Sequence, residues 1–243
     1  MAHIDTDEPC EQQTPFYRAD ATSYEAWWQD VFERGGGGAF GAACRRDREG
    51  ALADLARLAP HGSTLELAAG TGSYTASLLE SADHVTAVDA SAESLALARA
   101  KLASSAHRLT LVEADIFHFR PLRRYPMVFF AYWLSHVPLG LFESFWHLVA
   151  DALAPDGRAF FVDSTGAQSD PGLPGVYREQ DDLDNQVSTR ELDGRVYRVV
   201  KIAWSPGALE TRLAQLGWQV RIVQGEVSFW GIASREKAAD DDR

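Results

Sequence analysis

The sequence predicts an α/β fold, a doubly wound and mostly parallel β-sheet with helices on both faces. In the middle of the chain, short apolar runs alternate with segments of helical periodicity, the order expected of a parallel sheet whose strands are joined by helices. Each apolar run is also nearly continuous, as in strands that are buried on both faces. We find no internal repeat and no linker, so we expect residues 1–243 to form a single domain.

The elements of this sheet follow from the positions of the apolar runs. The expected strands are 64–68, 84–89, 109–113, 127–131 and 158–163, and the helices between them are 73–81, 92–103 and 139–153. Pro155-Asp156-Gly157 predicts a turn before the last of these strands.

The C-terminal part departs from this alternation. Residues 164–184 are rich in Gly, Pro and Asp and indicate a loop, and Asp193-Gly194 predicts a two-residue β-hairpin within 187–202. A helix at 206–216 and strands at 218–223 and 227–232 follow. The acidic end, 234–243, is expected to be a flexible tail.

Aromatic residues before the first strand predict an amphipathic helix, because Tyr24, Trp27, Trp28 and Phe32 recur at helical spacing. The four glycines at 35–38 are expected to end this helix, and a second helix is predicted at 45–59. The aromatic stripe is interpreted either as core packing or as a cover over a functional site.

Composition excludes some classes of partner. The net charge is −12 and the sequence pI is about 5.0, so we expect no nucleic-acid partner. No apolar run reaches the ~20 residues that span a bilayer, and the acidic start has no apolar core of a signal peptide. Cys10 and Cys44 have no metal-ligand spacing and are expected to be reduced thiols. We therefore predict a cytoplasmic protein without a membrane or metal site.

A glycine turn after the first strand is the most informative motif. In the run LELAAGTGSYT, an apolar strand containing Glu66 passes through Ala68, Gly70 and Gly72 into a helix. Small residues let a ligand approach the backbone, and a helix N-terminus offers free N–H groups. The turn therefore predicts a binding site for a nucleotide-like cofactor.

Two acidic residues at later strand ends sharpen this prediction. Asp89 ends the second strand, where a carboxylate can accept hydrogen bonds from ribose hydroxyls. Asp115 follows the third strand and can bind an adenine amino group, with Ile116 packed on the ring. The dinucleotide fingerprint G-x-G-x-x-G fits less well, because Ala68 replaces its first glycine or Thr75 its last.

These motifs resemble the class I S-adenosylmethionine-dependent methyltransferases, and more narrowly a bacterial subgroup acting on small molecules of secondary metabolism. The similarity rests on E-x-A-x-G-T-G at 66–72, Asp89, Ala114-Asp115-Ile116 and LAPDGRAFFVD at 153–163. It implies a Rossmann-like, seven-stranded sheet with an antiparallel last strand. It also implies S-adenosylmethionine as cofactor and S-adenosylhomocysteine as product. The implied cofactor contacts are Tyr24, Trp28, Glu66, Ala68, Gly70, Gly72, Asp89, Ala90, Asp115, Ile116 and Ala131.

The run FFAYWLSHVP at 129–138 follows the fourth strand toward the expected site. Ala131 is small enough to admit the methionine part of the cofactor. Trp133 either stacks on a ligand or covers the core. His136 either contacts the substrate, as a general base or an orienting group, or caps the next helix.

The resemblance also implies two walls for the substrate. Residues 1–44 are expected to form a lid, with Tyr17, Tyr24 and Trp28 facing the site. Residues 164–204, a loop with Tyr177 and Arg178 followed by the hairpin, are expected to form the opposite wall. The predicted substrate contacts are Tyr17, Trp133, His136, Tyr177 and Arg178.

The sequence therefore predicts methyl transfer to N or O of a small aromatic or heteroaromatic metabolite, for example a toxoflavin-type azapteridine. Two alternatives stay open at this point: a nicotinamide-dependent oxidoreductase on a similar sheet, and a non-catalytic scaffold that binds the same cofactor. Either a monomer or a homodimer is compatible with the sequence.

Overall fold

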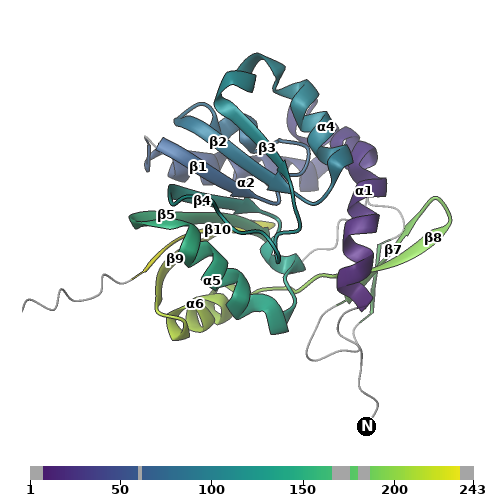
Figure 1. Ribbon diagram of the computed structural model, residues 1–243. Coiled ribbons are helices and arrows are strands. Elements are labelled where there is room, and N and C mark those ends of the chain that lie inside the picture. The colour runs from purple at the N-terminus through teal and green to yellow at the C-terminus, as the bar shows by residue number, and fades with distance from the viewer. Residues whose placement is uncertain (1–7, 60–61, 166–175, 180–186, 236–243) are drawn as a thin grey trace, which may run out of the picture.

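A seven-stranded sheet forms the centre of the computed structural model, which describes residues 8–59, 62–165, 176–179 and 187–235 (Figure 1). The strand order is β3-β2-β1-β4-β5-β10-β9. Its strands are β1 (Gly62–Leu67), β2 (Ala82–Asp89), β3 (Leu109–Glu113), β4 (Tyr125–Ala131), β5 (Leu153–Ser164), β9 (Trp218–Gln224) and β10 (Ser228–Arg235). All neighbouring pairs are parallel except those of β10, which is antiparallel to both β5 and β9. The predicted fold class is confirmed.

Side chains that alternate along the strands pack into two separate hydrophobic cores, one on each face of the sheet. On one face, Leu65, Phe130 and Phe161 pack with α5 (Phe142–Ala152) and α6 (Pro206–Gln215). On the other face, their sequence neighbours Phe129 and Phe160 pack toward α2 (Gly38–Ala56) and α3 (Thr75–Leu78). Because side chains alternate along a strand, continuous apolar runs are what a sheet covered on both faces requires.

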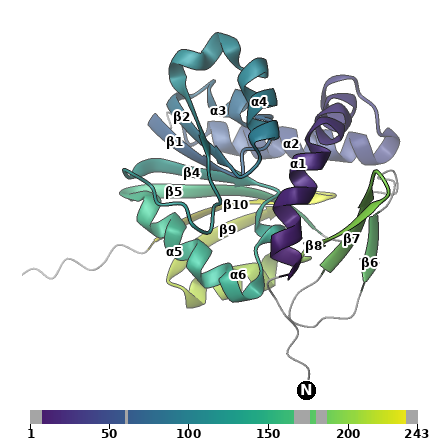
Figure 2. The same cartoon turned by 45° about the vertical axis from the view of Figure 1, so that its right-hand side comes forward.

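The remaining elements lie outside this seven-stranded sheet. Helix α1 (Glu8–Trp28) continues into a π-helical turn, η1 (Gln29–Glu33), and α4 (Ala92–Lys101) follows β2. A separate three-stranded sheet contains β6 (Val176–Glu179), β7 (Val187–Leu192) and β8 (Arg195–Val200). In Figure 2, α1 lies between the main sheet and this smaller sheet. Short 3-10 turns complete the chain: η2 (Ala103–Arg108), η3 (Leu134–His136) and η4 (Leu139–Leu141).

The predicted hairpin is confirmed, and the backbone of its turn accounts for the Asp-Gly pair in the sequence. Asp193 and Gly194 both have positive φ, 51° and 72°, as a type I′ turn requires. Other boundaries were wrong. Helix α2 begins at Gly38 rather than at residue 45, directly after Gly37, whose φ of 76° lies in the left-handed region.

Two further corrections concern the fifth strand and the loop after it. Strand β5 begins at Leu153, and the expected turn at Pro155-Asp156-Gly157 is instead a bulge, since β5 advances from 153 to 158 while β4 advances from 125 to 127. Residues 176–179, predicted as loop, pair with β7 as strand β6. The predicted tail, 234–243, was wrong for its first two residues, because β10 runs through Arg235. Residues 236–243 lie outside the described part. Among the described helices, none is long and apolar enough to cross a membrane.

Candidate active site

A large cavity opens at the carboxyl ends of the parallel strands, beneath α1. Its volume is about 1130 Å³, more than the ~300–1,000 Å³ of sites for one small ligand. Thirteen of the predicted site residues line it: Tyr17, Tyr24, Trp28, Glu66, Ala68, Gly70, Asp89, Ala90, Asp115, Ile116, Ala131, Trp133 and His136. The structure thus brings residues from 17 to 136 into one site.

The glycine turn after β1 has the backbone that its small residues predict. Ala68 and Gly70 both have φ of 54°, a left-handed conformation that favours glycine. A Cβ on Gly70 would meet no atom within 4 Å, whereas one on Gly72 would lie 3.0 Å from Ala98 Cβ. Gly72 does not line the cavity. Its lack of a side chain makes room for packing against α4, and its cofactor contact stays a prediction.

Asp89 holds the glycine turn through hydrogen bonds to the backbone. Its Oδ2 accepts a hydrogen bond from Gly70 N at 2.8 Å, and its Oδ1 accepts one from Ser91 N at 2.8 Å. Each carboxylate oxygen retains a second lone pair that can accept from a ligand hydroxyl. The Asp89 side chain therefore ties two loops together and still offers acceptors to the cavity.

Glu66 lies deeper, at the end of β1. It is 2% exposed, and Thr75 Oγ1 donates to its Oε2 at 2.6 Å. Burial raises the pKa of the Glu66 carboxyl to about 8, although the Thr75 hydrogen bond acts in the opposite direction. At neutral pH the Glu66 carboxyl is therefore mostly protonated, and it lines the cavity beside the glycine turn.

The third strand end and the loop after β4 form another wall. Asp115 accepts from Phe117 N at 3.0 Å and pairs with His118 Nδ1 at 2.7 Å, so part of its hydrogen-bonding capacity is used locally. Ile116 is buried, and the Trp133 ring lies 5.6 Å from the Phe117 ring. The Trp133 Nε1 is buried without a hydrogen-bond partner among the described residues. Trp133 therefore packs on the core cluster, as one of the two interpretations expected, and it also lines the cavity, while its contact with a ligand stays a prediction.

His136 is held by both of its ring nitrogens. Nδ1 lies 2.6 Å from Val200 O, and Nε2 lies 2.9 Å from the Tyr17 hydroxyl. A carbonyl oxygen only accepts, so Nδ1 must carry the proton and Nε2 accepts from Tyr17. Burial, together with Lys201 and Arg190, lowers the pKa of His136 well below its usual value. The imidazole is therefore neutral, and the lone pair of its Nε2 points at Tyr17 on α1.

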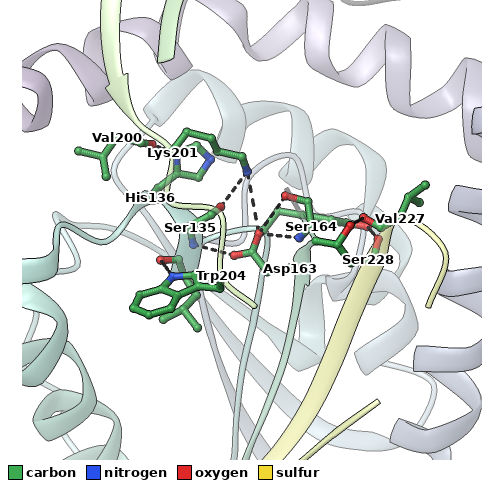
Figure 3. Close-up of polar contacts among 12 residues, drawn as sticks. Ser135, His136, Asp163, Ser164, Val200, Lys201, Trp204, Val227 and Ser228 are labelled. Atoms are coloured by element: carbon green, nitrogen blue, oxygen red, sulfur yellow. Dashed lines mark hydrogen bonds and ion pairs between the residues drawn. The ribbon is translucent and has the colours of Figure 1, made fainter. Parts of the chain in front are cut away.

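A buried polar network fixes the segment that carries His136 (Figure 3). Asp163, which is fully buried, accepts from Ser135 N and from Ser164 N, each at 2.7 Å. Lys201 Nζ donates to Ser135 Oγ at 2.8 Å and lies 3.9 Å from Asp163 Oδ1. Ser135 O accepts from Ile202 N at 2.7 Å. The end of β8 thus clamps the loop after β4 onto the end of β5.

Sequence reasoning missed several charged residues of this cavity, among them Asp20, Arg190 and Lys201. The signal for Asp20 was available, because it follows Tyr17 by three residues and precedes Tyr24 by four, the spacing of one helix face. Arg190 and Lys201 lie on β7 and just after β8, and only the tertiary structure brings those strands to the site. Tyr177 and Arg178 belong to β6, not to a loop, but their side chains lie outside the described part of the chain.

Comparisons with known proteins agree with this geometry. The profile of a family described as "Methyltransferase domain" matches residues 64–157. The structure of a DhpI–SAH complex is 32% identical, covering 95% of this chain and 98% of that one with a TM-score of 0.74. A DhpI–SAM–HEP complex is 31% identical, with coverages of 95% and 100% and a TM-score of 0.74.

A more distant match shows the same fold. The glycopeptide N-methyltransferase MtfA, solved with S-adenosyl-L-methionine, is 19% identical, covers 76% of this chain and 86% of its own, and has a TM-score of 0.56. A search of curated protein sequences finds no match.

The fold, the strand-end cavity and these similarities define a class I S-adenosylmethionine-dependent methyltransferase. The chain belongs to this family, and within it to the enzymes of small-molecule type, with S-adenosylmethionine as cofactor. The oxidoreductase alternative is thereby set aside.

Proposed function

We propose that the protein methylates N or O of a small aromatic or heteroaromatic metabolite. The observation that carries this proposal is the lining of the cavity, which is rich in aromatic side chains. The cavity is also larger than one small ligand requires. Beyond the residues already placed, its aromatic lining includes Trp27, Phe32, Phe40, Tyr74, Phe117, Tyr132 and Phe145. Flat, conjugated molecules gain both buried area and ring contacts in such surroundings. A toxoflavin-type azapteridine is one concrete candidate.

The residues at the strand ends fit the cofactor. Asp89 offers acceptors for ribose hydroxyls, and the open space at Gly70 allows a ligand to approach the backbone. Asp115, Ile116 and Trp133 are proposed to hold the adenine end, and Ala131 the methionine end. When bound, S-adenosylmethionine supplies an activated methyl group, so the protein's main tasks are to position the acceptor and exclude water.

For His136 we propose an orienting role. Its Nδ1–H is committed to Val200 O and its Nε2 to Tyr17, so the pair fixes the Tyr17 hydroxyl above the site. A neutral imidazole with a lowered pKa is a weak proton acceptor. Substituting His136→Gln is expected to lower kcat/KM by about tenfold, the cost of ~1.4 kcal/mol for one lost hydrogen bond. The shape of the pH–rate profile should stay that of the wild type.

The function is tested by incubating the protein with methyl-labelled S-adenosylmethionine and a panel of hydroxylated or nitrogen-bearing bicyclic aromatics. Mass spectrometry should show a gain of one methyl on at least one panel member, abolished by heat denaturation of the protein. Labelling of aliphatic acids alone, tested in parallel, would overturn the aromatic acceptor. The monomeric or homodimeric state and the cytoplasmic location stay predictions from the sequence.

A further inference from the structure

Three carboxylates that line the cavity already have hydrogen-bond donors. Asp89 accepts from Gly70 N and Ser91 N, and Asp115 from Phe117 N and His118. Glu66 is bound to Thr75. Glu11 and Asp151, which also line the cavity, are exposed to solvent. Asp89, Asp115 and Glu66 thus have donors within the chain, and we have proposed Asp89 and Asp115 for the cofactor rather than for the acceptor molecule.

Asp20 differs from them in its surroundings. It is half-buried and lines the cavity on the same face of α1 as Tyr17 and Tyr24. Within the described part of the chain, no donor lies within hydrogen-bond or ion-pair distance of its carboxylate. A partly buried carboxylate without a donor is costly, and such groups gather at sites where a proton moves.

The charges around Asp20 are consistent with this use. Arg190, from β7, is the charged group that stabilises its ionised form, and burial acts more strongly in the opposite direction, raising the pKa of Asp20 to about 6. The carboxylate in turn raises the pKa of the neighbouring Tyr17 and Tyr24 hydroxyls, after burial itself. On the other faces of α1, Arg18 is paired with Glu113 and Glu25 with Lys101.

We propose that Asp20 is the catalytic base, accepting on a carboxylate oxygen the proton that the acceptor atom loses. In this step the acceptor atom bonds to the methyl carbon, the carbon–sulfur bond breaks with its electrons going to sulfur, and the proton passes to Asp20. The acceptor is then a hydroxyl or a protonated nitrogen rather than an atom without a proton to lose. This inference rests on the proposed function, in that it assumes a small acceptor bound beneath α1.

The first test needs no acceptor. In protein labelled with ¹³C at the aspartate carboxyls, the signal that disappears in Asp20→Asn is assigned to Asp20. In the S-adenosylhomocysteine complex it should titrate near pH 6, and at a lower pH in the S-adenosylmethionine complex, because the sulfonium adds a positive charge next to it. Equal midpoints in the two complexes would overturn the proposal, since the carboxylate would then not face the reacting sulfur.

The second test uses methyl transfer to the aromatic panel. Asp20→Asn should lower kcat by roughly 10²–10⁴-fold and abolish the rise of rate with pH that is centred near pH 6 in the wild type. The matched control Glu33→Gln changes an exposed acidic residue outside the cavity and should keep the wild-type rate and profile. Retained kcat in Asp20→Asn, with or without a raised KM, would overturn the proposal.

Cofactor binding and thermal stability of Asp20→Asn distinguish a loss of catalysis from a loss of folding. Asp20→Asn should bind S-adenosylhomocysteine within about threefold of the wild type. Because the folded-state pKa of Asp20 is raised, its ionisation weakens the fold as pH rises from about 4 to 6. The variant should therefore have a Tm at pH 8 no lower than the wild type. If the wild-type protein methylates no panel member, the aromatic acceptor fails, while the carboxyl titration still decides the position of Asp20.

Discussion

The effect of burial on the pKa of Glu66 can be measured in solution. The folded-state pKa of Glu66 is about 8, so at pH 7 the free protein holds a proton there. A positively charged ligand in the cavity favours the ionised carboxylate and lowers this pKa. We therefore expect Glu66 to release a proton when S-adenosylmethionine binds at pH 7.

Calorimetric titration in two buffers of different ionisation enthalpy measures this proton. The observed binding enthalpy should differ between phosphate and Tris for the wild type, and the difference should vanish in Glu66→Gln. Identical enthalpies in both buffers for the wild type would contradict the raised pKa.

Asp89 is the residue whose loss should weaken cofactor binding most. Its carboxylate holds Gly70 N in place and faces the cavity with its remaining lone pairs. Hydrogen bonds to charged groups contribute ~1.5–3 kcal/mol each, so Asp89→Ala should weaken S-adenosylhomocysteine binding by roughly tenfold to a hundredfold. Calorimetry checks this against Asp83→Asn, a matched exposed aspartate at the other end of β2. Equal affinities of the two variants would remove Asp89 from the site.

At the scale of elements, β8 and the loop after β4 depend on Asp163. This carboxylate is 0% exposed and accepts two backbone N–H groups from different segments. Replacing it with Asn turns one acceptor into a donor that faces an N–H group. Because breaking a buried charged network leaves polar groups unsatisfied, we expect Asp163→Asn to cost about 2–4 kcal/mol.

Urea denaturation of the same variant gives this loss directly. The midpoint should fall with an unchanged m-value, while the exposed Asp83→Asn stays within about 0.5 kcal/mol of the wild type. An unchanged midpoint in Asp163→Asn would show that the network does not hold the loop.

Elements with local signals were predicted well. The strands carry continuous apolar runs, and Asp193-Gly194 sets the hairpin by its own backbone preference. Strand β6 was missed because its short segment lies among Gly, Pro and Asp, and only pairing with β7 makes it a strand. The buried charge of Asp163 was read as a strand end, since nothing local announces that Lys201, 38 residues further on, approaches it.

At the scale of the whole molecule, the sequence could place residues at strand ends but not the cover above them. The parallel sheet requires that Glu66, Asp89 and Asp115 meet at one edge, because each lies at or just after the end of a strand of the same direction. That Asp20 faces Arg190 depends on how α1 packs between the two sheets, a long-range arrangement (Figure 2). The cavity residues at the strand ends were therefore predicted, whereas charged residues contributed by α1 and the smaller sheet were missed.

We propose that cofactor and acceptor share the cavity that lies between α1 and the main sheet. Hydrogen exchange of the full chain, with and without S-adenosylhomocysteine, tests this arrangement. We expect increased protection in α1 as well as in the turns after β1 and β2, with α6 unchanged as an internal reference. Protection confined to the main sheet, with α1 exchanging at its ligand-free rate, would contradict it.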